Sequence, residues 1–151
     1  MEPQFVTKPA FTVVGLRIQT KPMGQEIPAL WDQFVPRMGE IPYQAQEHAS
    51  YGLMDNFDFA QSKLDYMAGN PVEQVDELPA GMTRWDVPAN TYAVFAATLA
   101  TIPQTFDFIY NTWPPTSDYQ QVAGPYFERY GEDFSPANPV LSIYIPIAKR
   151  S

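Results

Sequence analysis

The stretch FTVVGLRIQT, residues 11–20, is rich in β-branched residues, and its side chains alternate in character. This pattern is typical of a β-strand. After a loop, residues 27–34 carry apolar side chains at the i, i+3, i+4 and i+7 spacing of an amphipathic helix. Two more strands are predicted at residues 48–54 and 63–72. The first half of the chain therefore reads as strand, helix, strand, strand.

The second half repeats this order. Strands are predicted at residues 82–87, 91–99, 124–131 and 140–148. Between the second and third of these, Thr101 opens a capping box, and residues 102–113 follow at helical spacing until Pro114 and Pro115 stop the helix. A shift of 75 residues relates the two halves: it places Ile27–Pro28 on Ile102–Pro103, Tyr51 on Tyr126 and Pro71 on Pro146.

We therefore predict an α+β fold built from duplicated strand–helix–strand–strand units. One domain, residues 1–151, would contain two pseudo-repeats at about 10–72 and 88–148. These units would form an antiparallel sheet with two main helices on the same side of it. A cleft between the halves is then the natural place for a central ligand groove.

Composition narrows the classes of function. The chain has no cysteine and one histidine, His48, so Cys-ligated or His-rich metal sites are excluded and no metal or cofactor is expected. The formal net charge is −8, and the basic residues do not cluster beyond Lys149–Arg150. Such an acidic protein is not expected to bind nucleic acid directly, whereas it could attract a cationic ligand.

Targeting signals are not found in the sequence. No stretch approaches the roughly 20 apolar residues that a membrane helix needs. The first residues, MEPQ, lack the basic start and apolar run of a signal peptide. We therefore expect a cytoplasmic protein with no membrane partner.

The strand PYFERY, residues 125–130, contains the clearest candidate for a functional residue. Side chains alternate along a strand, so Tyr126, Glu128 and Tyr130 share one face. If Glu128 is buried, it must be hydrogen-bonded, paired with a cation or protonated. Tyrosine hydroxyls could hold the carboxylate and a cationic ligand could complete the site. A solvent-exposed strand face, where glutamate is ordinary, is the alternative.

Other aromatic residues could line the groove. Tyr51, Tyr66 and Trp113 lie in or beside predicted elements, and aromatics form 15% of the chain. In the last strand the apolar residues 141, 143, 145 and 147 would face the core, so Tyr144 on the other face would reach the groove. Plain core packing remains the alternative for each of these rings.

A series of short sequence motifs along the chain resembles the GyrI-like small-molecule-binding family. This family is the effector-binding domain of multidrug-responsive and AraC-type bacterial regulators. The matching pieces are FTVVGLR (11–17), LWxxF (30–34), YG (51–52), DYxxG (65–69), LPxGM (78–82), VPA (87–89), YAVF (92–95), IYxxW (109–113), FERY (127–130) with Phe134, and IYIPI (143–147). The resemblance implies a groove for hydrophobic, often cationic ligands. It also places the family's functional acid on Glu128 and its helix tryptophan on Trp113.

Three functions follow as hypotheses. The leading one is a stand-alone bacterial small-molecule-binding protein for hydrophobic, cationic, aromatic compounds, using Glu128, Trp113, Tyr51, Tyr66, Tyr126 and Tyr144. The alternative is a hydrolase of strained or reactive small molecules, in which Glu128 and Trp113 would be catalytic, as the resemblance implies for some members. The third is a protein-interaction module with an exposed apolar patch. A homodimer and a separate regulatory partner both remain open.

Overall fold

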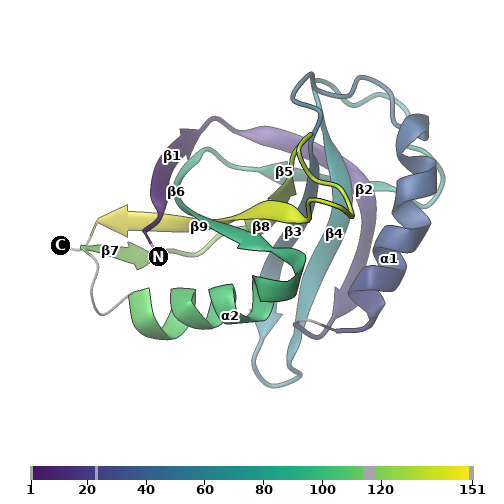
Figure 1. The fold of residues 1–151 in the computed structure, drawn as a ribbon. Coiled ribbons are helices and arrows are strands. Elements are labelled where there is room, and N and C mark those ends of the chain that lie inside the picture. Colours follow the sequence, from purple (N-terminus) through teal and green to yellow (C-terminus); the bar gives the residue numbers. More distant parts are fainter. Residues whose placement is uncertain (1, 23, 114–117, 150–151) are drawn as a thin grey trace.

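The computed structural model describes residues 2–22, 24–113 and 118–149, and it forms a curved antiparallel sheet with two helical segments (Figure 1). The strands are β1 (Gln4–Lys8), β2 (Phe11–Thr20), β3 (Ser50–Asp58), β4 (Lys63–Val72), β5 (Thr83–Val87), β6 (Asn90–Thr98), β7 (Tyr119–Gln121), β8 (Tyr126–Tyr130) and β9 (Val140–Lys149). The predicted α+β class with two helices is confirmed. Strands β1 and β7 were not predicted, because each is short and lacks a clear alternating pattern.

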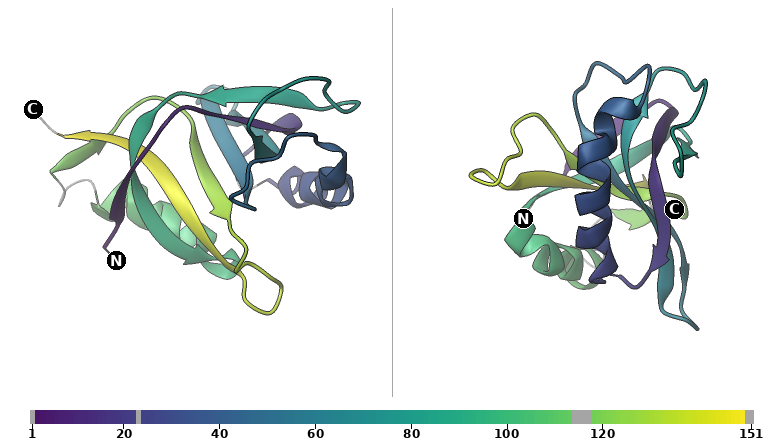
Figure 2. Two further views of the ribbon diagram at one scale, coloured as in Figure 1. Left: turned by 90° about the horizontal axis from the view of Figure 1, so that it is seen from above. Right: turned by 90° about the vertical axis from the view of Figure 1, so that its right-hand side faces the viewer.

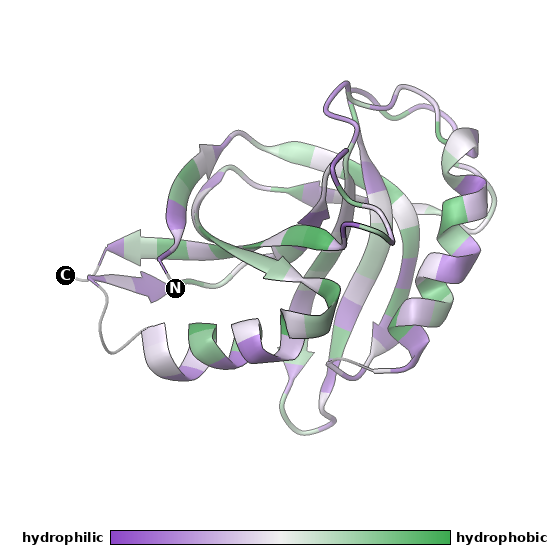
Figure 3. Ribbon diagram, in the orientation of Figure 1, coloured by the Kyte–Doolittle hydropathy of each residue, from purple (hydrophilic) through white to green (hydrophobic). Residues whose placement is uncertain are grey.

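The first helical segment is α1 (Glu26–Phe34), which continues into the 3-10 turns of η1 (Val35–Glu40). The second runs through η2 (Leu99–Thr101), α2 (Ile102–Asp107) and the π-helical turn η3 (Phe108–Thr112). Hydrophobic and hydrophilic residues alternate along both segments (Figure 3), as expected of helices that pack on a sheet by one face. The predicted helix stop at Pro114–Pro115 lies outside the described residues.

The strand order shows the same connectivity in the two halves. The order is β1-β6-β9-β8-β3-β4-β2-β5, with β7 paired to β9. From the central β8–β3 contact, one direction gives β3, β4 and β2, and the other gives β8, β9 and β6. The outer strands are exchanged, because β1 precedes the first half yet pairs with β6, and β5 precedes the second half yet pairs with β2. The duplication itself stays a prediction.

The 75-residue shift that relates the two halves is wrong by one residue for strand β8. Tyr51 lies opposite Gly69, so the shift would place Tyr126 opposite Tyr144, whereas Phe127 occupies that position. A slip of one residue along a strand turns every side chain to the other face of the sheet. Tyr51 and Tyr126 therefore point to opposite faces and are not counterparts.

The two faces of the sheet have separate cores. On one face α1 packs against β2 and β4, and α2 with η3 packs against β6 and β9. The other face holds a second core, which includes Tyr51, Leu53 and Phe127. Figure 2 shows both helices on one side of the sheet, with α1 upright and α2 lower and to its left in the right-hand view. Within the described residues, no helix is long and apolar enough to cross a bilayer.

Candidate functional site

A cavity of about 1290 Å³ lies between the two helical segments and the sheet face that they cover. Helix α1 contributes Ile27, Pro28 and Trp31, and α2 contributes Ile102, Pro103 and Phe106. The floor comes from the central strands and includes Met54, Tyr66, Tyr126, Glu128 and Tyr130. The walls are mostly apolar and aromatic, and the volume is large enough for a drug-sized molecule.

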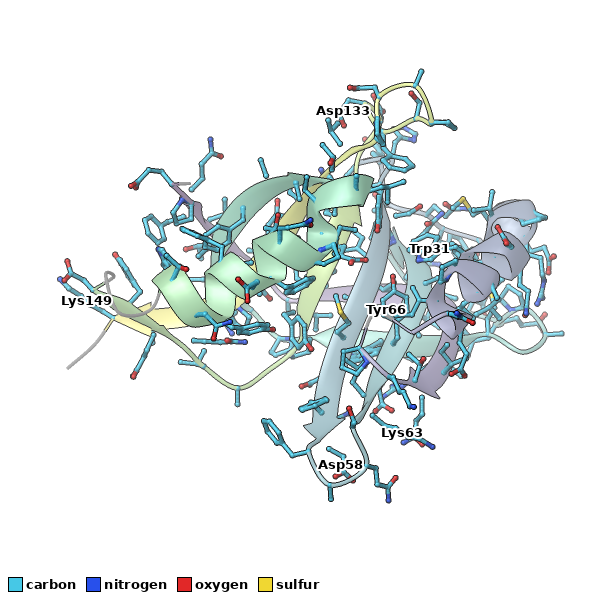
Figure 4. All side chains as sticks on the ribbon, turned by 60° about the horizontal axis from the view of Figure 1, so that its bottom comes forward. Trp31, Asp58, Lys63, Tyr66, Asp133 and Lys149 are labelled. Atoms are coloured by element: carbon cyan, nitrogen blue, oxygen red, sulfur yellow. The ribbon has the colours of Figure 1, made fainter. Side chains whose placement is uncertain are left out.

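Glu128 is the charged group of this floor and is only 6% exposed. The hydroxyls of Tyr66 and Tyr130 both donate to its Oε1, at 3.1 and 3.0 Å. The Trp31 indole N–H donates to the Tyr66 hydroxyl at 2.8 Å, which orients that hydroxyl toward the acid. Figure 4 labels Trp31 and Tyr66 among the side chains. No arginine, lysine or histidine of the described residues forms an ion pair with Glu128.

The electrostatics of the site follow from this burial. Desolvation raises the pKa of Glu128, and the hydrogen bonds from Tyr130 and Tyr66 oppose that rise only in part. Desolvation, reinforced by the negative charge of Glu128, also raises the pKa values of Tyr66 and Tyr130 above their ordinary value. Both phenols therefore stay protonated and serve as donors. The arrangement holds a buried carboxylate whose charge has no opposite charge beside it.

Gly52 makes room for this arrangement. It lies directly opposite Glu128 in the β3–β8 ladder. A Cβ at Gly52 would lie 2.8 Å from Glu128 Oε1 and would overlap the Tyr66 hydroxyl. A side chain as small as a methyl group would therefore compete with the acid and its donor for the same space.

We expect Gly52→Ala to lower the free energy of unfolding by about 1–3 kcal/mol, the usual cost of overfilling a packed site. Gly39→Ala is the matched control, because nothing lies within 4 Å of a Cβ built there. The control should leave stability unchanged or slightly higher. Urea unfolding of both variants checks this, and a Gly52→Ala protein as stable as the control would contradict the close packing around Glu128.

Of the other residues named from the sequence, Tyr66 and Tyr126 line the cavity with Glu128, whereas Tyr51, Tyr144 and Trp113 do not. The groove and the apolar face of β9 lie on the same side of the sheet, since Ile143 is opposite Glu128 in the ladder. Tyr144 therefore points to the opposite side, contrary to expectation. Trp113 packs against Phe95 in the core beneath α2, at 5.4 Å between ring centroids.

Tyr51 and Tyr144 instead surround a cation of the protein itself. The Lys8 ammonium lies 5.1 Å from the centroid of the Phe11 ring and 5.9 Å from those of Tyr51 and Tyr144. It also donates to the Tyr51 hydroxyl at 3.4 Å, and that hydroxyl donates to Glu47. Burial lowers the pKa of Lys8. These rings therefore form a cation–π contact within the fold, on the side of the sheet away from the cavity.

The sequence pattern places Trp31 only in the apolar stripe of its helix and does not predict its hydrogen bond to Tyr66. A buried indole N–H usually needs an acceptor, and this is the signal that could have marked Trp31 as more than core. The sequence pattern also misses a group of polar residues in the cavity lining, Gln44, Ser50 and Asn70. They come from two strands and a loop, so no local pattern joins them.

The sequence matches one protein family and a curated relative. The family model described as integron-associated effector binding protein matches residues 4–147. The transcriptional regulator BrlR of Pseudomonas aeruginosa is 34% identical over 152 residues, a match that covers 97% of this chain. The chain spans only 56% of the length of BrlR.

Solved structures share the fold. SAV2435 bound to tetraphenylphosphonium has a TM-score of 0.77 and 17% identity, and the match covers 98% of this chain and 94% of SAV2435. An integron cassette protein from the mobile metagenome of Vibrio cholerae has a TM-score of 0.71 and 18% identity, with 97% of this chain and 96% of that one covered. At these identities the likeness shows the fold alone.

Proposed function

Because this chain belongs to the family of integron-associated effector binding proteins, we propose that its effector is a hydrophobic, aromatic cation. The ligand would lie in the cavity between α1, α2 and the sheet, with Glu128 as its anchor. The observation that carries this proposal is the buried carboxylate of Glu128, which has tyrosine hydroxyls for partners and no ion pair among the described residues.

A cation in the cavity would supply what the carboxylate lacks. A buried charge without an opposite charge is unfavourable, and a ligand cation brings one at short range. The rings of Trp31, Phe106 and Tyr126 line the same space and could add contacts to a cation or to its aromatic substituents. The net charge of −8 would favour the approach of a cation. SAV2435, which shares the fold, has been solved with such a cation, tetraphenylphosphonium.

The test is isothermal titration calorimetry with tetraphenylphosphonium and with triphenylphosphine oxide, a neutral molecule that presents similar rings. The proposal requires that the phosphonium bind and that the neutral compound bind much more weakly. Equal affinity for the two compounds would show that the cavity recognises shape without charge. Absence of binding by the phosphonium would overturn the proposal.

Cation binding should also release a proton. The raised pKa of Glu128 means that the free protein holds a proton on this acid at a higher pH than an ordinary carboxyl does. A cation favours the ionised form, so affinity should rise with pH until Glu128 is ionised in the free protein, and fall by up to about tenfold per pH unit below that point. Calorimetry at one pH in buffers of different ionisation enthalpy measures the released proton. A binding enthalpy independent of the buffer throughout the acidic range would contradict the linkage.

The hydrolase alternative has less support from the geometry. It would use Glu128 together with Trp113, but Trp113 packs against Phe95 and is not among the residues that line the cavity. The tryptophan that is linked to Glu128 through hydrogen bonds is Trp31, which donates to the Tyr66 hydroxyl. Its N–H orients a phenol and has no acid–base function.

A further inference from the structure

Three polar side chains line part of the cavity wall near α1 and the central strands. Gln44, Ser50 and Asn70 border the same space as Glu128. They are joined in one chain of hydrogen bonds: Ser50 Oγ lies 2.6 Å from Asn70 Oδ1, and Asn70 Nδ2 lies 2.9 Å from Gln44 Oε1. Asn70, in the middle of the series, is only 6% exposed, whereas Ser50 is partly buried and Gln44 is exposed.

Gln44 determines which atom donates and which accepts in each of these hydrogen bonds. Gln44 Nε2 lies 2.9 Å from the carbonyl oxygen of Met38 and 3.1 Å from that of Ile41. Carbonyl oxygens only accept, so the amide nitrogen of Gln44 must face them and its oxygen must face Asn70. Asn70 then has to donate to Gln44, which turns its own oxygen toward Ser50.

Ser50 is consequently left as an acceptor. Its hydroxyl has one proton, and that proton is committed to Asn70 Oδ1. The lone pairs of Ser50 Oγ are what it can offer to a molecule in the cavity. A ligand N–H or O–H could bond to them, whereas an ether, a carbonyl or a tertiary amine would meet a second acceptor.

Ser50 has a defined position relative to the acid. It lies opposite Tyr130 in the β3–β8 ladder, and Gly52, two residues further along β3 on the same face, lies opposite Glu128. Two residues of a strand span about 7 Å. The cavity floor therefore holds a carboxylate and an oriented hydroxyl acceptor roughly one aromatic ring apart.

We propose that Ser50 is a specificity-determining residue that selects, among the cations held by Glu128, those with a hydrogen-bond donor about one ring away from the positive centre. This inference rests on the proposed function, because Glu128 has to place the cation first. The ligand class is then an aromatic cation that carries a ring N–H or O–H group, such as an amino-substituted dye. Aromatic cations whose corresponding group is alkylated would bind less tightly.

The test compares (4-aminophenyl)triphenylphosphonium with its dimethylamino analogue by calorimetry. In wild type the amino compound should bind more tightly. Ser50→Ala should reduce this preference by about three- to tenfold, the usual range for one hydrogen bond. Tetraphenylphosphonium, which has neither group, measures any change that Ser50→Ala makes to cation binding in general, and the preference is a ratio of two affinities in which such a change cancels.

A second variant tests which atoms donate in the hydrogen bonds between Ser50, Asn70 and Gln44. Asn70→Ala keeps the Ser50 hydroxyl but frees its proton, so Ser50 can donate as well as accept and the preference for the amino compound should fall. A preference that persists in Asn70→Ala, or that is unchanged in Ser50→Ala while tetraphenylphosphonium still binds, would overturn the inference and leave the proposed function standing. Failure of wild type to bind any of the three phosphonium ions would overturn the proposed function as well.

Discussion

Glu128→Gln should lower the affinity for tetraphenylphosphonium by about ten- to a hundredfold, because a charge-assisted contact in a water-poor cavity contributes roughly 1.5–3 kcal/mol. Glutamine keeps the shape of the side chain and can still accept hydrogen bonds from Tyr66 and Tyr130. The neutral ligand triphenylphosphine oxide should lose little. Titration calorimetry of wild type and variant with both ligands measures the difference directly.

Glu132→Gln is the matched control for this experiment. It removes the same charge from an exposed position four residues away, so it separates the general field of an acidic protein from the contact in the cavity. Its effect on affinity should be small at physiological ionic strength, because exposed charges are screened. Equal losses from Glu128→Gln and Glu132→Gln would mean that Glu128 acts only through the net charge. Equal losses for the cation and the neutral ligand would mean that Glu128 shapes the site without pairing with charge.

Glu128→Gln should also change the free energy of unfolding. Glu128 has a raised pKa in the folded state, so the folded protein binds this proton more tightly than the unfolded chain does. As the pH rises from the ordinary carboxyl range through the raised pKa, the buried charge forms and lowers the free energy of unfolding of wild type. Glu128→Gln lacks this contribution and should be as stable as wild type at low pH and more stable at neutral pH.

Phe127→Ala should destabilise the fold by about 3–5 kcal/mol, the range for removing a large buried ring. Phe127 is fully buried on the face opposite the cavity, and its ring contacts those of Phe11, Tyr51, Tyr92 and Tyr144. It also lies on the strand that joins the two halves of the sheet. The loss of this ring would therefore open a hole in the middle of the second core.

The control for this substitution is Phe59→Ala. Phe59 lies at the turn between β3 and β4 and is 89% exposed, so its removal should change the free energy of unfolding by less than about 0.5 kcal/mol. Chemical unfolding of both variants under one set of conditions gives the comparison. A loss below about 1 kcal/mol for Phe127→Ala would contradict its assignment to the core.

The helices and strands were predictable because they depend on local patterns of apolar and polar residues. Alternation in residues 11–20 and 140–148, and the stripe in residues 27–34, predicted strands and a helix that the structure contains. The short β1 was missed, because five residues between Pro3 and Pro9 hold too little pattern and are stabilised by pairing with β6. The 75-residue shift missed the register by one residue, and a slip of that size is invisible to a comparison of whole elements but reverses the direction of Tyr51.

The features that could be predicted without the structure are therefore those that depend on residues close together along the chain. Tyr126, Glu128 and Tyr130 share a face because successive side chains in any strand point to opposite sides. Which face of the sheet the helices cover depends on packing between distant segments, and this packing places Glu128 in a cavity, whereas Tyr51 and Tyr144 contact Lys8 on the opposite face. It also joins Trp31 to Tyr66, and Ser50 to Asn70 and Gln44, because these contacts cross between segments that only packing brings together.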